Sequence, residues 1–103
     1  MKALSNQFVR RVDHVVWKEI EGKGILLNLE NGSYFEVGPV GLAIWQRCDG
    51  KTPYSKIAQN IAKKYDADVS RVDRDLKEFV SELKKLKIAE LLDEPEKTAA
   101  RNN

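Results

Sequence analysis

The sequence contains very few of the residues from which catalytic and metal sites are usually built. It has one histidine, His14, and one cysteine, Cys48, among its 103 residues. A single histidine excludes a histidine-based metal site or a Ser-His-Asp arrangement built within the chain. A single cysteine excludes an internal disulfide and fits a reducing compartment. We therefore expect His14 at the surface, Cys48 as a buried inert thiol, and no catalytic residue, metal or cofactor.

Long hydrophobic runs and a strong net charge are also missing. No apolar stretch approaches the roughly 20 residues that a membrane span needs, and the N-terminus lacks the apolar segment of a secretory signal. Eighteen Lys and Arg against 16 Asp and Glu leave a net charge of +2, which is too small to indicate a nucleic-acid or lipid partner. The length and the 42% hydrophobic content predict one globular domain, and we expect it to be cytoplasmic.

The stretch NGSYFEVGPVGLAIW, residues 31–45, predicts a turn, a strand and the start of a helix. Asn31-Gly32 favours a type I′ hairpin turn, in which both central residues have positive φ. Ser33–Val37 predicts a strand, ended by Gly38-Pro39 because proline cannot donate to a ladder and suits a helical first turn. Its alternation places Phe35 and Val37 on one face and Tyr34 and Glu36 on the other. We expect this strand to be the last of its sheet, followed by helices only.

Two earlier segments, His14–Ile20 and Ile25–Leu29, also predict strands, joined by a turn at Gly22-Lys23-Gly24. With Ser33–Val37 they form a three-stranded antiparallel meander whose order is fixed by local turns. The predicted fold is α+β and winged-helix-like, a three-stranded antiparallel sheet followed by three helices. We expect residues 1–13 to be an N-terminal leader, 14–92 the domain and 93–103 a disordered tail.

Capping residues and apolar periodicity define the three helices. The first is predicted from about Pro39 to Cys48, with Gly50 as the C′ glycine. Thr52 as N-cap followed by Pro53 opens the second, and Asp68 caps the third. The predicted apolar stripe of the second helix is Ile57, Ala58, Ile61, Ala62 and Tyr65, and that of the third is Val69, Val72, Leu76, Phe79, Val80, Leu83 and Leu86.

A non-catalytic chain of this kind fits a binding module, and two classes of partner are open. The first is an extended peptide that adds as a strand beside Ser33–Val37, with the third helix as the wall of a groove. The alternative is a winged-helix DNA-binding transcriptional regulator. The third helix has basic residues, but its acids Asp73, Asp75, Glu78 and Glu82 would oppose phosphates and disfavour DNA. It also remains open that the edge is merely short and protected by Glu36 and Pro39.

The chain resembles a known family. The run VVWKEIEGKGILLNLENGSYFEVGPVGLAIWQRCDG, followed by PYSKIAQNIAKKYDAD and VDRDLKEFVSELKKLKI, is similar to the pyrroloquinoline-quinone synthesis protein D (PqqD-like) family, also called the RiPP precursor peptide recognition element. RiPPs are ribosomally made, post-translationally modified peptides. The resemblance extends from His14 to Leu91. It departs from the family pattern at Val37-Gly38, where Leu-Asn is usual, and at Lys87-Ile88, where Gly-Leu is common.

The resemblance implies a non-catalytic peptide-binding adaptor. Such proteins bind the leader of a precursor peptide as a fourth strand and present it to a modifying enzyme, either a radical SAM enzyme or a leader peptidase and cyclase. Neither nucleic acid nor membrane is an expected partner, and the protein is expected to be a monomer or weak dimer, since an open edge can accept its twin. The implied peptide-binding residues are Ser33, Tyr34, Phe35, Glu36 and Val37 on the strand and Asp73, Leu76, Lys77, Val80 and Lys84 on the helix. Lys77 and Lys84 would favour an acidic leader, and Asp73 a basic one.

Overall fold

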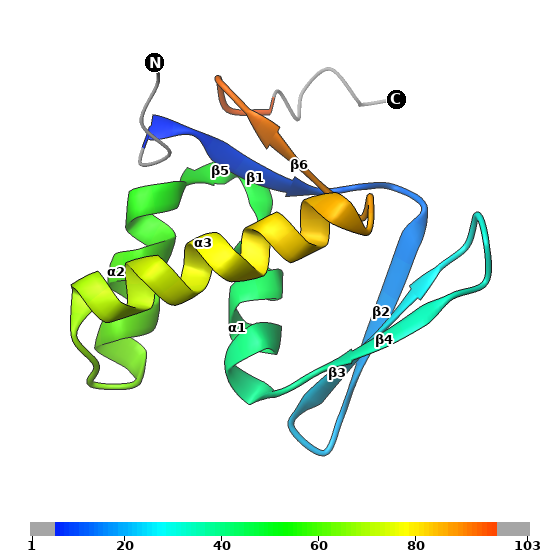
Figure 1. Cartoon of the computed structure of the whole chain (residues 1–103), viewed down its shortest axis with the longest axis horizontal. Helices are drawn as coiled ribbons and strands as arrows, with labels where there is room; N and C mark the ends of the chain where they lie inside the picture. Colours follow the sequence, from blue (N-terminus) through cyan, green and yellow to red (C-terminus); the bar gives the residue numbers. More distant parts are fainter. Residues whose placement is uncertain (1–5, 97–103) are drawn as a thin grey trace.

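The computed structural model describes residues 6–96 and divides them into two three-stranded antiparallel sheets and three helices (Figure 1). One sheet has the strand order β2-β3-β4 and the other has the order β5-β1-β6. The elements are β1 (Phe8–Arg11), β2 (Val15–Ile20), β3 (Lys23–Asn28), β4 (Tyr34–Val37), α1 (Pro39–Arg47), β5 (Asp49–Pro53), α2 (Tyr54–Lys64), α3 (Val69–Lys85) and β6 (Ala89–Leu92). None of the helices in this range combines the length and apolar character needed to cross a membrane.

The predicted meander is confirmed, with a correction to its first turn. The type I′ geometry lies at Glu21-Gly22, whose φ angles are +52° and +82°, and it joins the paired residues Ile20 and Lys23. Lys23 and Gly24 therefore belong to β3 rather than to a flexible turn. Gly24 is buried against α1, because a Cβ there would lie 2.9 Å from Leu42 Cδ1.

The sequence had predicted a type I′ turn at Asn31-Gly32. The second turn of the meander is of another type. Gly32 has a φ of +77°, but Asn31 has no positive φ. The buried Asn28 organises the loop instead: its N–H donates to Ser33 O (2.9 Å), and its carbonyl accepts from Gly32 N–H (2.8 Å). Its side-chain oxygen also accepts from Glu30 N–H at 2.8 Å. These bonds close a longer loop in which only Gly32 needs the left-handed conformation.

The second sheet was not predicted. Its central strand β1 lies within residues 8–11, which the sequence had assigned to a leader, and Val9 in this strand is fully buried. Strands β5 and β6 follow β4, so the expectation of helices only after Ser33–Val37 is wrong. The segment after β6 also contacts this sheet, since Glu96 N–H donates to Gly50 O at 2.7 Å. The structure does not describe residues 1–5 of the predicted leader or residues 97–103 of the predicted tail.

The three predicted helices are confirmed, but their caps differ. Helix α2 starts at Tyr54 with Pro53 as N-cap, because Thr52 instead donates its hydroxyl to Asp49 Oδ2 at 3.2 Å. Asp68 is the N-cap of α3, although its side chain accepts from the Ser70 hydroxyl rather than from the helix backbone. Gly50 is not the C′ residue of α1, since the C-cap is Cys48 and Gly50 lies within β5. The largest fully buried side chains are Trp45, Tyr54, Leu26, Ile57, Leu76, Ile88, Val9 and Cys48.

Candidate functional site

Strand β4 is an edge of its sheet, as the sequence predicted. The hydrogen bond from Asn28 N–H to Ser33 O (2.9 Å) identifies this pair as a bonded one. Bonded pairs alternate along an antiparallel ladder, so Leu26–Phe35 and Gly24–Val37 are bonded as well. The N–H and C=O groups of the intervening residues, Tyr34 and Glu36, therefore point away from β3. The open edge presents two donors and two acceptors.

The side chains of β4 alternate between the core and solvent. Phe35 and Val37 are half-buried and pack against the core. Tyr34 is 71% exposed on the opposite face, and the exposed Glu36 carboxylate lies 3.1 Å from Lys23 Nζ. Both ends of this ion pair are solvated, so it contributes only ~0–1 kcal/mol. The strand is thus anchored through one face while its outward edge stays open.

One flank of α3 faces the junction between β4 and α1. A Cβ at Gly41 would lie 3.1 Å from Val37 Cβ and 3.3 Å from Phe79 Cε1, so this glycine allows the three elements to meet. Asp75, one turn before Phe79, lines a cavity together with Val40 at the start of α1. The helical repeat places Glu82 and Leu86 on the same flank as Phe79. We call Asp75, Phe79, Glu82 and Leu86 the acidic flank of α3. Its Leu86 is 38% exposed.

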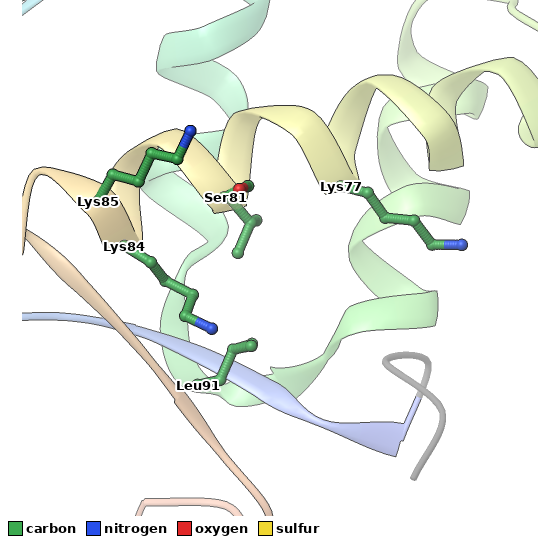
Figure 2. Close-up of a pocket in the computed structure, with 6 residues that line it drawn as sticks. Lys77, Ser81, Lys84, Lys85 and Leu91 are labelled. Atoms are coloured by element: carbon green, nitrogen blue, oxygen red, sulfur yellow. The ribbon is translucent and has the colours of Figure 1, made fainter. Parts of the chain in front are cut away.

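The helix residues that the sequence proposed as peptide contacts do not gather on this flank. Leu76 is 0% exposed and Val80 is 3% exposed, so both side chains belong to the core. Asp73 and Lys77 form an ion pair at 3.1 Å on the other flank, and Lys77 and Lys84 line a cavity beside Leu91 of β6 (Figure 2). The sequence left open which flank of α3 faces the strand; in the structure, the α3 residues near β4 are acidic and apolar, not basic. The sequence signal that could have found them is Gly41, a glycine inside a helix that marks a close approach.

Neither Cys48 nor His14 is part of a reactive cluster. Cys48 is fully buried, its thiol donates to Ile44 O at 3.2 Å, and burial raises the pKa of this thiol to about 12. It is therefore the buried thiol that the sequence predicted. His14 is half-buried, with Nε2 at 3.7 Å from Glu30 Oε1. Within residues 6–96, no three or more His, Cys, Asp or Glu side chains group in a way that could hold a metal ion.

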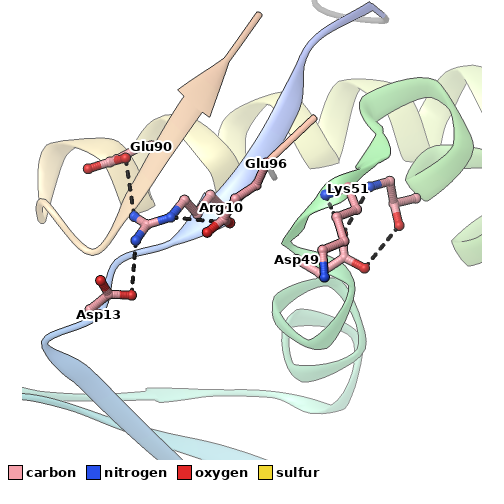
Figure 3. A network of polar contacts seen from close by, with 7 residues as sticks. Arg10, Asp13, Asp49, Lys51, Glu90 and Glu96 are labelled. Carbon is pink, nitrogen blue, oxygen red and sulfur yellow. Dashed lines mark hydrogen bonds and ion pairs between the residues drawn. The ribbon is translucent and has the colours of Figure 1, made fainter. Parts of the chain in front are cut away.

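The most connected polar group is Arg10, and its role is structural. Its guanidinium contacts Asp13 at 2.9 Å, Glu90 at 3.2 Å and Glu96 at 3.3 Å (Figure 3). Burial alone would lower the pKa of Arg10, but the three carboxylates outweigh it and raise this pKa. The contacts tie β1 to β6 and to the segment that follows it. Asp49 is held separately, by hydrogen bonds from Lys51 N–H and Thr52 N–H.

The fold and the site define a class of protein: a small α+β domain that presents an open strand edge beside a long amphipathic helix. The family profile of coenzyme PQQ synthesis protein D (PqqD) matches residues 23–89. This range includes β3, β4 and all three helices, and it is well over half of the chain. The chain belongs to the PqqD family, which confirms the resemblance seen in the sequence.

Individual relatives agree with this assignment. The PqqA binding protein of Rhizobium meliloti (strain 1021) is 32% identical over 73 residues, which are 71% of this chain and 72% of that protein. The structure of TbiB1 in complex with the TbiA(beta) leader peptide has a TM-score of 0.73 and 31% identity, and the match covers 79% of this chain and 94% of that one. Lasso peptide synthetase B1 complexed with the leader peptide has a TM-score of 0.72 over 80% and 96% of the two chains. At 21% identity it supports the fold alone.

Proposed function

We propose that this protein is a non-catalytic adaptor that binds the leader segment of a ribosomally made precursor peptide and presents it to a modifying enzyme. The observation that carries the proposal is the open β4 edge, at which the N–H and C=O groups of Tyr34 and Glu36 point outward. Strand addition uses these main-chain groups for affinity and the alternate side chains of the peptide for specificity. The names of two relatives, a PqqA binding protein and a leader-peptide complex, support the same class of ligand.

The position of the acidic flank leads us to propose the chemistry of the leader. In an added strand, residues opposite Phe35 and Val37 direct their side chains to the same face of the sheet as these two residues. That face adjoins Phe79, with the exposed part of Leu86 along the same flank. We therefore expect apolar or aromatic leader residues at alternate positions. Asp75 and Glu82 favour Lys or Arg next to them, so a basic leader is preferred over an acidic one.

The modifying enzyme is proposed to be a separate chain, either a radical SAM enzyme or a leader peptidase acting with a cyclase. The basis is the residue inventory, because one histidine and a buried cysteine leave this chain without an evident nucleophile and base. A short-peptide gene and a gene for such an enzyme beside this one would identify both partners.

Titration of the purified protein with the leader of that precursor, and separately with duplex DNA, tests the proposed function. Strand addition depends on main-chain hydrogen bonds and apolar contacts, so leader affinity should change little between low and moderate salt. DNA binding through phosphate contacts would weaken steeply over the same range. Tight, salt-sensitive binding of DNA without binding of leader would refute the adaptor function.

A further inference from the structure

A second strand edge lies beside the opposite flank of α3. A cavity of about 420 Å³ separates the helix from β6, and it is lined by Lys77, Val80, Ser81, Lys84 and Lys85 of α3 and by Leu91 of β6. Figure 2 shows the Lys84 side chain extending from the helix toward Leu91. The cavity thus has an apolar floor, formed by Val80 and Leu91, and a basic wall.

The main chain of β6 is available on this side. β6 is an edge of the β5-β1-β6 sheet, and the bond from Val12 N–H to Ile88 O (3.1 Å) fixes which pairs are bonded. Alternation makes Arg10–Glu90 a bonded pair, so the intervening residues Ala89 and Leu91 direct their N–H and C=O groups away from β1. The independent bond from Arg11 N–H to Cys48 O agrees, since Arg11 pairs with Ala89 but bonds toward β5. The cavity therefore has outward backbone groups at Leu91, as the β4 edge has at Tyr34 and Glu36.

The charged side chains that line this cavity are all positive, because its lining contains three lysines and no carboxylate. Among the described residues, Lys77 has an ion-pair partner, Asp73, whereas Lys84 and Lys85 have none. The nearest acid on β6, Glu90, is held by Arg10 at 3.2 Å. Lys84 also borders a neighbouring cavity that is lined by His14 and Lys87 and by the carboxylates of Glu30 and Glu90. An occupant that neutralises this surface must be acidic.

We propose that the β6 edge and the basic flank of α3, formed by Lys77, Lys84 and Lys85, are a second strand-accepting groove that binds an extended acidic segment of a partner polypeptide. Carboxylates of the segment pair with the lysines, an apolar side chain rests on Leu91, and the backbone of the segment bonds to Leu91. This site uses a different strand and a different flank of α3 from the β4 edge, so it does not depend on the proposed function. Together with leader binding at the β4 edge, which rests on the proposed function, this site would let one chain hold two extended segments, one on each side of α3.

The probe is a short synthetic peptide of alternating Glu and Val, with a peptide of alternating Lys and Val as its charge-reversed control. Both are titrated into the full-length ¹⁵N-labelled protein. The Glu-Val peptide should shift the amide resonances of Ala89 and Leu91 and slow the hydrogen exchange of the Leu91 amide, while Tyr34 and Glu36 stay unchanged. Equal binding of the Lys-Val peptide, shifts at Tyr34 and Glu36 alone, or no binding would overturn the proposal.

A matched pair of charge variants tests the lysines. Lys77→Glu with Lys84→Glu should weaken binding of the Glu-Val peptide about tenfold, because two exposed ion pairs are lost and replaced by repulsion. Lys56→Glu with Lys63→Glu makes the same change in net charge at exposed positions of α2 and should leave binding nearly unchanged. Equal weakening by the two double variants would show that the overall charge of the protein, and not the proposed groove, controls binding, and would overturn the proposal.

Discussion

Replacing Glu36 by proline tests which edge of the β2-β3-β4 sheet binds the leader. Proline removes the backbone N–H, and its ring obstructs an incoming strand, but an edge strand tolerates it where that N–H faces outward. Glu36 meets this condition, because its N–H points away from β3. The ladder between β3 and β4 therefore keeps its hydrogen bonds in the Glu36→Pro variant.

The expected loss follows from the number of groups affected. One hydrogen bond contributes ~0.5–1.5 kcal/mol net to leader binding, and the steric block adds to this loss. Because each ~1.4 kcal/mol is a factor of ten in affinity, leader affinity should fall at least about tenfold. Loss of the exposed ion pair with Lys23 lowers folding stability by ~0–1 kcal/mol at most. The Glu36→Gln variant, which keeps the N–H, measures by itself how loss of the carboxylate changes leader affinity.

The sheet offers a matched control on its other edge. Leu29 N–H bonds to His14 O at 2.8 Å, and alternation from this pair directs the N–H of Glu19 on β2 away from β3. Glu19→Pro is thus the same substitution, in the same sheet, at an exposed outward position. Isothermal titration of the leader gives both affinities, and circular dichroism confirms both folds. If folded Glu36→Pro binds as well as Glu19→Pro, the leader does not use the β4 edge.

Four further outcomes are expected. Asp75→Lys should weaken binding of a basic leader a few-fold, while Lys77→Glu should leave that binding nearly unchanged. Equal effects of the two variants in the affinity assay would mean that the leader does not lie along the acidic flank of α3. The purified protein alone should leave its precursor unmodified by mass spectrometry, and any cleaved or modified product from an enzyme-free preparation would contradict the adaptor role. Cys48 should react with a thiol reagent only when the protein unfolds, because the thiol is buried and its pKa is raised to about 12, whereas rapid labelling of the folded protein would contradict this. Burial alone would raise the pKa of Asp49, but hydrogen bonds from Lys51 and Thr52 outweigh burial and hold this pKa below its ordinary 3.8. The contribution of Asp49 to folding stability is therefore complete above about pH 4 and is lost as the pH falls through the lowered pKa. Measured by acid unfolding, the Asp49→Asn variant should show a flatter dependence of stability on pH in this range.

The meander and the helices were predictable because their signals are local. Alternation and turn residues within residues 14–37 define β2, β3 and β4, and apolar periodicity defines α2 and α3. The second sheet has no such signals. β5 contains Gly50 and Pro53, and β1 carries Arg10, two of whose three carboxylate partners, Glu90 and Glu96, come from the far end of the chain. Pairing between segments so distant in sequence leaves no periodic trace in either one.

The candidate site, like the fold, could be predicted from the sequence only in part. The strand edge follows from the alternation of Ser33–Val37 and from its place at the end of the meander. The flank of α3 does not, because acidic and basic residues border the apolar stripe on both sides. A tertiary contact decides between them, the approach of Phe79 to Gly41 and Val37. Similarly, only the register with β3 shows that Tyr34 and Glu36, rather than Phe35, have outward backbone groups.

Amide hydrogen exchange with and without the bound leader is the most direct test of the central claim. In the free protein the amides of Tyr34 and Glu36 should exchange rapidly, because they face solvent at the open edge, whereas those of Phe35 and Val37 are held by β3. A saturating leader should slow exchange at Tyr34 and Glu36, because its carbonyl groups accept hydrogen bonds from both amides. Saturation that leaves both amides as fast as in the free protein would contradict strand addition to β4.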